Sequence, residues 1–286
     1  MARNYCMHAL LLVLIALTSG ARASGDEVVL ITGATGRTGA LVYNLLKKDG
    51  YTIRGIVRSV DKAREVLDCS SCDTGDGIYV GDVTDETTLT TPMEGVTRLI
   101  ILSGSVPLKA DNGTYYFPPG GYPKDVDFNG VKKQVIAAKK AGVKHVLLVS
   151  SMGTTTPNSF LDRLGNGQAL FYKLNGEAAL MSAGLPFTIV KPAGLLGEEL
   201  PAGTRRLVIG HDDHLMDGVT SMAIPRADVA DVLKEAIKQP MEATQNIRFD
   251  LSSDPTRPAT GDFRKLFEDA GNLSADDDDG SKISLA

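Results

Sequence analysis

A glycine-rich stretch near the N-terminus has the residue types and the spacing that bind a dinucleotide phosphate. Residues 32–39 are Thr-Gly-Ala-Thr-Gly-Arg-Thr-Gly. Gly33 permits a sharp turn, Gly36 lets the backbone approach a pyrophosphate, and Gly39 lets a helix pack closely on a strand. The N–H groups at the start of that helix are then available to phosphate oxygens. We expect the cofactor-binding residues of this stretch to be Gly33, Thr35, Gly36, Arg37, Thr38 and Gly39.

Two arginines favour NADP(H) as the cofactor. Arg37 lies in the first turn of the expected helix, where the helix dipole disfavours a cation unless an anion binds there. Arg58 follows the second expected strand, where a site for NAD usually has an acidic residue for the ribose 2′-hydroxyl. Two guanidinium groups at these positions can clamp a 2′-phosphate. The alternative for Arg58 is an ordinary surface arginine.

The elements that must position these residues alternate between strand and helix. The apolar run 28–31 predicts the first strand, and apolar residues at helical spacing predict a helix that Gly50 ends. Further strands are expected at 51–57, 77–80, 97–102, 146–149 and 187–191, with helices at 61–67, 126–141 and 168–182. Short strands at 206–210 and 220–224, a helix at 228–238 and a last strand at 246–252 follow. This order predicts an α/β fold, a Rossmann-type doubly wound parallel sheet in a single domain.

Small and polar residues follow several of the expected strands. Because open parallel sheets bind ligands at the carboxyl ends of their strands, we expect these residues near the cofactor. Asp82 is placed to reach the adenine or, equally, to begin the next turn. Ser151 is a candidate to polarise a substrate oxygen. The remaining cofactor candidates at this edge are Ser103, Gly104, Pro192 and Ala193.

The long connection at 104–125 has no periodicity and is rich in proline, glycine and aromatic residues. A loop of this length inside a compact domain is usually functional or disordered. We interpret it as a lid over the nicotinamide end, with a small-molecule substrate beneath it.

Size and charge limit the other classes of partner. The 286 residues are 43% hydrophobic and carry a formal charge of −5 without a basic stripe, which disfavours a nucleic-acid partner. The sequence His-Asp-Asp-His at 211–214 suggests a hairpin more than a metal site, so no metal is expected. The acidic run at 276–279 predicts a disordered tail at 273–286. The oligomeric state is not encoded in any pattern that we can interpret.

The first residues have the pattern of a secretory signal. A basic start precedes nine apolar residues and the small-residue site Ala21-Arg22-Ala23, so we expect a signal peptide at 1–23 and a dinucleotide-binding domain at 24–272. The apolar run is too short for a membrane anchor, which predicts the secretory pathway and no stable anchor after cleavage. Cys69 and Cys72 are either unremarkable loop cysteines or a local disulfide.

Six motifs together carry a resemblance to a known family. They are Thr32 to Gly39, Gly55 to Arg58, Val149 to Gly153, Lys173 with Glu177, Gly184 to Ile189 and Arg226 to Ala230. The chain resembles the atypical short-chain dehydrogenase/reductases, in particular the NmrA-like NAD(P)-binding proteins of plants and algae. The resemblance implies a substrate cleft formed by the C-terminal segments, 2′-phosphate binding by Arg37 and Arg58, and a nicotinamide ribose held by Lys173. It also suggests a plastid location as the alternative to secretion.

One position departs from the wider superfamily. Active members use a Tyr four residues before that Lys to protonate the substrate oxygen, and here the residue is Ala169. Tyr172 lies about 100° round the helix and cannot simply replace it. We therefore expect Ser151 and Lys173 to be the catalytic residues of an NADPH-dependent reductase of carbonyls or quinones. The alternatives are an NADPH-binding sensor without turnover and, for Lys173 with Glu177, an exposed ion pair.

Overall fold

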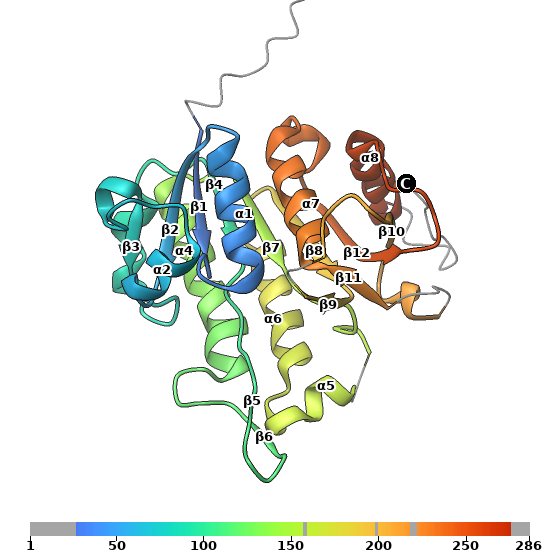
Figure 1. Cartoon of the computed structure of the whole chain (residues 1–286), viewed down its shortest axis with the longest axis horizontal. Coiled ribbons are helices and arrows are strands. Elements are labelled where there is room, and N and C mark those ends of the chain that lie inside the picture. Colours follow the sequence, from blue (N-terminus) through green and yellow to red (C-terminus); the bar gives the residue numbers. More distant parts are fainter. Residues whose placement is uncertain (1–26, 157–158, 198–199, 218–221, 276–286) are drawn as a thin grey trace, which may run out of the picture.

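A twisted sheet of eight strands forms the centre of the molecule, which we describe from a computed structural model (Figure 1). The structure describes residues 27–156, 159–197, 200–217 and 222–275. The strand order is β10-β12-β8-β7-β4-β1-β2-β3, and β10 alone among these strands is antiparallel to its neighbour. The strands are β1 (Val28–Thr32), β2 (Thr52–Val57), β3 (Ile78–Val80), β4 (Arg98–Ile101), β7 (His145–Val149), β8 (Phe187–Pro192), β10 (Arg206–Gly210) and β12 (Ile247–Asp254). This is the doubly wound Rossmann-type sheet that the sequence predicted.

Helices cover both faces of the sheet. One face packs against α1 (Arg37–Lys48), α2 (Val60–Val66), α7 (Arg226–Lys238) and α8 (Phe263–Ala275). The other packs against α3 (Thr90–Met93), α4 (Val131–Ala141) and α6 (Ala169–Met181). Within β4, Ile100 faces the first layer while Leu99 and Ile101 face the second. Because both faces are buried, the parallel strands are continuously apolar rather than alternating.

The C-terminal part of the chain differs from the sequence prediction in two ways. The strands expected at 206–210 and 220–224 do not form a hairpin, because β10 pairs with β12 whereas β11 (Ala223–Pro225) pairs in parallel with β9 (Gly194–Leu196). Helix α8 was not predicted, and it includes residues 273–275 of the expected tail. Its buried residues are spaced three or four apart, which places them on one face against the core: Leu266, Phe267, Ala270 and Leu273. The rest of that tail lies outside the described residues.

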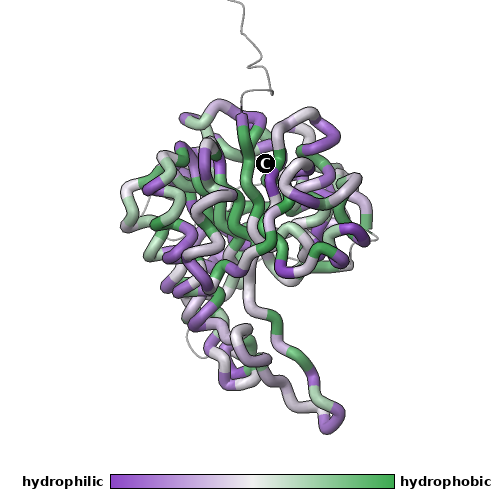
Figure 2. Tube along the Cα trace, turned by 90° about the vertical axis from the view of Figure 1, so that its left-hand side faces the viewer, coloured by the Kyte–Doolittle hydropathy of each residue, from purple (hydrophilic) through white to green (hydrophobic). Residues whose placement is uncertain are grey.

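The connection at 104–125 contains a short antiparallel hairpin that projects from the body as an arm (Figure 2). Its strands are β5 (Leu108–Lys109) and β6 (Tyr115–Tyr116). The arm leaves the edge where the parallel strands end, beside α5 (Phe160–Arg163) (Figure 1). Phe117 is buried against Gly167, where a Cβ would overlap the Phe117 ring. The arm therefore has an anchored base, and a substrate beneath it stays a prediction.

Cys69 and Cys72 form a disulfide in the connection between α2 and β3, with Cα atoms 5.0 Å apart. Of the two alternatives left by the sequence, the structure has the disulfide. Residues 1–26 lie outside the described part of the chain, so the signal peptide at 1–23 stays a prediction. Within the described residues, no helix has both the length and the apolar character needed to cross a bilayer.

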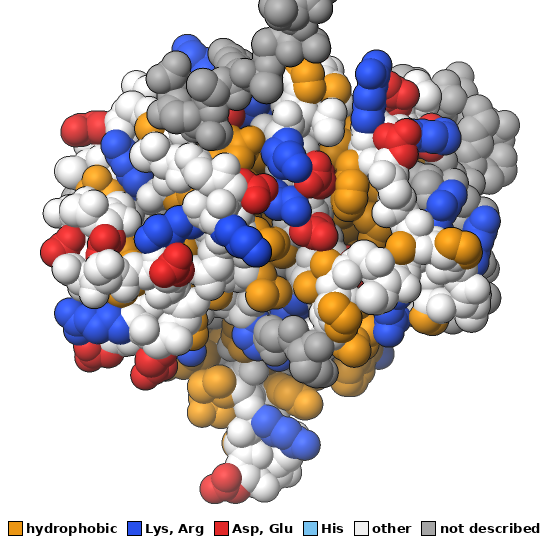
Figure 3. All heavy atoms as spheres, turned by 45° about the horizontal axis from the view of Figure 1, so that its top comes forward, with side chains coloured by type: hydrophobic (Ala, Val, Ile, Leu, Met, Phe, Trp, Pro, Cys, Tyr) orange, Lys and Arg blue, Asp and Glu red, His pale blue; other side chains and the backbone are white. Residues whose placement is uncertain are grey.

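The face shown in Figure 3 carries basic and acidic side chains side by side. Hydrophobic side chains gather instead near the base of the projecting arm, at the lower edge of that view. Several aromatic and aliphatic side chains of the arm and of α5 are exposed: Leu108, Tyr115, Tyr116, Tyr122, Phe160 and Leu161.

Candidate functional site

The glycine-rich loop packs tightly between β1 and the end of β4. Gly33 has a φ of +69°, and a Cβ there would lie 2.7 Å from the Leu102 carbonyl carbon and from the Ser103 nitrogen. A Cβ at Gly39 would overlap the Gly33 carbonyl oxygen. Both positions therefore exclude a side chain, and the expected roles of these glycines in the turn and in close packing are confirmed.

The start of α1 is built to accept an anion. Gly36 is its N-cap residue in an extended conformation, no side chain caps the helix, and its first turn contains no acidic residue. The first N–H groups of a helix have no intrahelical partners, so a phosphate at this point satisfies them and complements the dipole. Two lysines occupy the last turn, and Gly50 follows with a φ of +84°. The residues present therefore fit the pyrophosphate of a dinucleotide.

Arg37 and Arg58 lie at the same edge of the sheet. Arg37 opens α1 directly after the β1 loop, and Arg58 follows β2, which pairs with β1 so that Thr32 lies opposite Ile56. Both side chains are exposed. This placement agrees with a clamp on a 2′-phosphate, which stays a prediction.

Asp82 and Ser103 occupy the ends of β3 and β4. Asp82 begins a turn, because its Oδ1 accepts hydrogen bonds of 2.8 Å from both the nitrogen and the Oγ1 of Thr84. The turn-forming alternative for Asp82 is therefore confirmed, and its contact with adenine stays a prediction. The Ser103 hydroxyl accepts a hydrogen bond of 3.2 Å from the amide of Gln134, which is fully buried on α4. A packed neighbour thus orients Ser103 at the cofactor edge.

Lys173 pairs with a buried carboxylate that sequence reasoning missed. Its Nζ lies 2.8 Å from Oδ1 of Asp127, whose side chain is 1% exposed against 21% for Lys173. The Ser105 nitrogen and hydroxyl also donate to Asp127. A Cβ on Gly104 would lie 3.4 Å from both Lys173 Nζ and Asp127 Oδ1, so the pair sits directly beside the end of β4. Gly104 and Lys173, both predicted as cofactor ligands, are thereby brought together.

The close contact between two helices explains why Asp127 reaches Lys173. Asp127 lies in a π-helical segment, Lys124–Gly130, that leads into α4. A Cβ on Gly176 would overlap the Asp127 carbonyl oxygen, so the two backbones touch. Lys173 and Gly176 share one face of α6 because they are three residues apart. The only sequence signal was an acidic residue next to Val126 on an otherwise apolar helix face.

Glu177 does not pair with Lys173, so the interpretation of an exposed ion pair is wrong. Its side chain is 1% exposed and accepts a hydrogen bond of 2.7 Å from Nε of Arg248 on β12, and another from the Ser150 hydroxyl. Burial lowers the pKa of the Arg248 guanidinium, but Glu177 and Asp212 outweigh this effect and the pKa is raised. The physical reason is that Glu177 faces the sheet whereas Lys173 faces the segment before α4.

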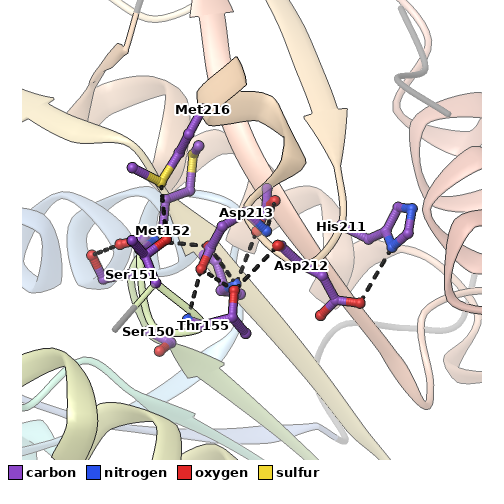
Figure 4. Close-up of polar contacts among 12 residues, drawn as sticks. Ser150, Ser151, Met152, Thr155, His211, Asp212, Asp213 and Met216 are labelled. Atoms are coloured by element: carbon purple, nitrogen blue, oxygen red, sulfur yellow. Dashed lines mark hydrogen bonds and ion pairs between the residues drawn. The ribbon is translucent and has the colours of Figure 1, made fainter. Parts of the chain in front are cut away.

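Ser151 begins a turn at the end of β7 that touches the end of β8 (Figure 4). Its hydroxyl donates to the Met152 carbonyl oxygen at 2.9 Å, and the Met152 nitrogen donates to the Pro192 carbonyl oxygen at 3.0 Å. The Ala193 nitrogen is bonded to the Leu251 carbonyl oxygen at 2.8 Å. The structure therefore brings Ser151, Pro192 and Ala193 together at one edge, as the sequence predicted for strand ends.

A cavity of about 400 Å³ opens near the turn that Asp82 begins. Neither Ser151 nor Lys173 lines it. Its lining residues come from that turn, the base of the arm and the start of α4: Thr84, Gly120, Asp125, Asn129, Lys132, Lys133 and Ile136. Among the described residues, no group of three or more His, Cys, Asp and Glu side chains is arranged to hold a metal ion.

Comparisons with known proteins agree with this geometry. Residues 33–240 match the family model described as NAD(P)H-binding. The chain is 36% identical over 276 residues to sanguinarine reductase of Eschscholzia californica, covering 86% of this chain and 97% of that protein. It is also 36% identical over 266 residues to an uncharacterised chloroplastic protein of Arabidopsis thaliana, covering 88% and 78%.

A solved structure of low sequence identity supports the fold. A putative NAD-dependent epimerase/dehydratase from Bacillus halodurans superposes with a TM-score of 0.65 at 22% identity, covering 85% of this chain and 99% of that one. The Rossmann-type sheet, the glycine loop at the start of α1 and these sequence matches have a common explanation. The chain belongs to the NAD(P)H-binding family of atypical short-chain dehydrogenase/reductases, with the NmrA-like proteins among its relatives.

Proposed function

We propose that the protein binds NADP(H) and reduces a small carbonyl compound or quinone by hydride transfer. The observation that carries this proposal is the Lys173–Asp127 pair beside Gly104, at the sheet edge that also holds the glycine loop and Ser151. The reductase relative, 36% identical over nearly its whole length, supports the reaction class. Arg37 and Arg58 support the choice of the 2′-phosphorylated cofactor.

Each side chain has a separate task in this proposal. The reduced nicotinamide supplies the hydride when the cofactor is bound. Lys173, held in place by Asp127, donates hydrogen bonds to the nicotinamide ribose. Ser151 donates to the substrate oxygen and so stabilises the negative charge that develops there. The arm at 104–125 bounds the space for the substrate.

Ala169 restricts which substrates the site can reduce. It is the first residue of α6, one turn before Lys173, and it supplies no proton. The proton that completes the reduction must then come from water, and the acceptor must carry the developing charge by delocalisation. A quinone meets this requirement better than a simple ketone. The same observation favours a second candidate function, an NADPH-binding sensor without turnover.

Nucleotide titration tests the cofactor. We expect tighter binding of NADPH than of NADH, and a loss of about tenfold in NADPH affinity for Arg37→Ser and for Arg58→Ser, the size of one charge-assisted hydrogen bond at an exposed site. Arg64→Ser is the matched control, because Arg64 is an exposed arginine that pairs with Asp61 within α2. Equal affinity of the wild-type protein for NADH and NADPH would contradict the proposed clamp.

A panel of quinones and carbonyl compounds separates the two candidate functions. Steady NADPH oxidation with any of them supports the reductase. Tight NADPH binding without oxidation of any member supports the sensor. A plastid location is also part of the proposal, because the Arabidopsis relative is described as chloroplastic. Imaging of a fluorescent fusion of the full chain distinguishes a plastid from the secretory pathway.

A further inference from the structure

One carboxylate, that of Asp213, holds the turn that follows Ser151 (Figure 4). Its Oδ1 accepts from the Gly153 nitrogen at 2.7 Å, and its Oδ2 accepts from the Thr155 nitrogen at 2.7 Å and from the Thr155 hydroxyl. Asp213 is 5% exposed and lies far away in sequence, just after β10. The turn 151–155 is therefore fixed from outside its own strand.

A buried lysine connects Asp213 to the neighbouring strands. Lys191 is fully buried at the end of β8, and its Nζ lies 2.7 Å from Asp213 Oδ1 and 3.1 Å from Asp250 Oδ1. The Asp213 nitrogen donates to Asp250 Oδ2 at 2.7 Å. Lys191 directly precedes Pro192 in the sequence. The same ion cluster thus ties the Ser151 turn to the end of β8.

The charges of this cluster are unequally stabilised. Burial raises the pKa of the Asp213 carboxyl, but the hydrogen bonds from Lys191 and Thr155 outweigh it and the pKa is lowered. Burial raises the pKa of Asp250, and Lys191 compensates only in part. Asp213 is therefore the carboxylate that keeps its charge beside the lysine. Buried ion pairs of this kind are often replaceable by apolar residues without loss of stability, so stability alone does not explain them.

The residue before Asp213 holds the other side of the same turn. Asp212 Oδ1 accepts from Arg248 at 2.6 Å, and Arg248 binds Glu177, to which the Ser150 hydroxyl donates. Asp212 and Asp213 both have left-handed backbone conformations, with φ of 49° and 67°. Consecutive residues other than glycine rarely adopt this conformation, and here it directs the two carboxylates into separate polar chains.

We propose that Asp213 and Lys191 are positioning residues that set the geometry of the nicotinamide half of the cofactor site. They fix the Ser151 turn and the Pro192–Ala193 segment relative to each other, and Asp212 supports the turn through Arg248 and Glu177. The proposal rests on the proposed function for the statement that these segments face the nicotinamide. The contacts of the clamp itself are independent of that function.

Amide hydrogen exchange of the protein without nucleotide tests the clamp directly. Both oxygens of Asp213 accept two hydrogen bonds, so the amide group of Asp213→Asn must turn its NH₂ toward a donor in either orientation. We expect the Gly153 and Thr155 amides to exchange at least about tenfold faster in this variant. Asp228→Asn is the matched control, because Asp228 is a buried carboxylate that accepts from Gly203 and touches neither segment. Unchanged exchange at Gly153 and Thr155 would overturn the clamp.

Binding measurements test the link to the nicotinamide. We expect Asp213→Asn to bind the 2′-phosphorylated adenosine fragment of the cofactor as tightly as the wild-type protein does, while the fluorescence of bound NADPH changes. With an accepted quinone, kcat should fall about tenfold or more with little change in KM for NADPH. Unchanged NADPH fluorescence and unchanged kcat in a variant with faster exchange would refute the positioning role. If the wild-type protein binds no NADPH, the proposed function fails, and the exchange experiment still judges the clamp.

A milder variant covers the case in which Asp213→Asn does not fold. Thr155→Val removes one hydroxyl donor from an exposed side chain and leaves every charge of the cluster in place. We expect a smaller increase in exchange at Gly153 and Thr155, about threefold. An exchange pattern identical to that of the wild-type protein would count against the clamp.

Discussion

The Lys173–Asp127 pair makes an asymmetric prediction, because its two members differ in their access to water. Lys173→Met leaves the carboxylate of Asp127, whose side chain is 1% exposed, with Ser105 as its remaining printed donor residue. Removing one partner of a buried pair typically costs 3–5 kcal/mol, and the Ser105 donors reduce this to about 3 kcal/mol. Asp127→Asn instead leaves an ammonium group that is one-fifth exposed, which water solvates in part. We expect a loss of about 1–2 kcal/mol for that variant.

Urea unfolding followed by circular dichroism measures both losses. The double variant, Lys173→Met with Asp127→Asn, should be more stable than Lys173→Met alone, because no carboxylate remains to be buried without a cation. Lys234→Met is the matched control. Lys234 is 18% exposed, similar to Lys173, but its partner Asp231 is 23% exposed, so its loss should cost at most about 1 kcal/mol. Equal losses for the two single variants, or strictly additive losses in the double variant, would refute the reasoning.

Three further predictions follow from other parts of the structure. Burial lowers the pKa of His145 from 6.5 to about 3, so its contribution to stability is present above pH 6.5 and is lost toward pH 3, at about 1.4 kcal/mol per pH unit; His145→Gln should flatten this slope in urea titrations between pH 7 and 4. Gly39→Ala should reduce NADPH affinity at least about tenfold in a fluorescence titration, because its Cβ would overlap the Gly33 carbonyl oxygen, and native affinity would contradict this packing argument. Ala169→Tyr should increase the rate of ketone reduction, measured as NADPH oxidation, by about 100-fold, because it adds a proton donor one turn before Lys173; a quinone should gain much less.

Local sequence patterns predicted the sheet and the phosphate loop. Continuous apolar runs identified the parallel strands, and the three glycines of residues 33–39 identified the turn into α1. These features are predictable because they depend on backbone conformation and on burial over a few consecutive residues. Helix α8 was overlooked although its apolar residues have helical spacing, so that omission was an error of interpretation rather than a limit of the sequence.

The roles of single charged residues could not be obtained in this way. Nothing near Lys173 in the sequence indicates Asp127 as its partner, because 46 residues separate them and a backbone contact at Gly176 brings their segments together. Asp212 and Asp213 suggested only a hairpin, yet their partners lie on β7, β8 and β12.

The sequence by itself therefore determined which segments are strands, where the glycine loop turns, and which strand ends carry candidate ligands. The tertiary structure decided which charges face one another: Lys173 with Asp127, Glu177 with Arg248, and Lys191 between two carboxylates. The physical reason is range. Periodicity and turn geometry act between neighbours in the chain, whereas the pairing of buried charges depends on the register and packing of elements that are distant in the sequence.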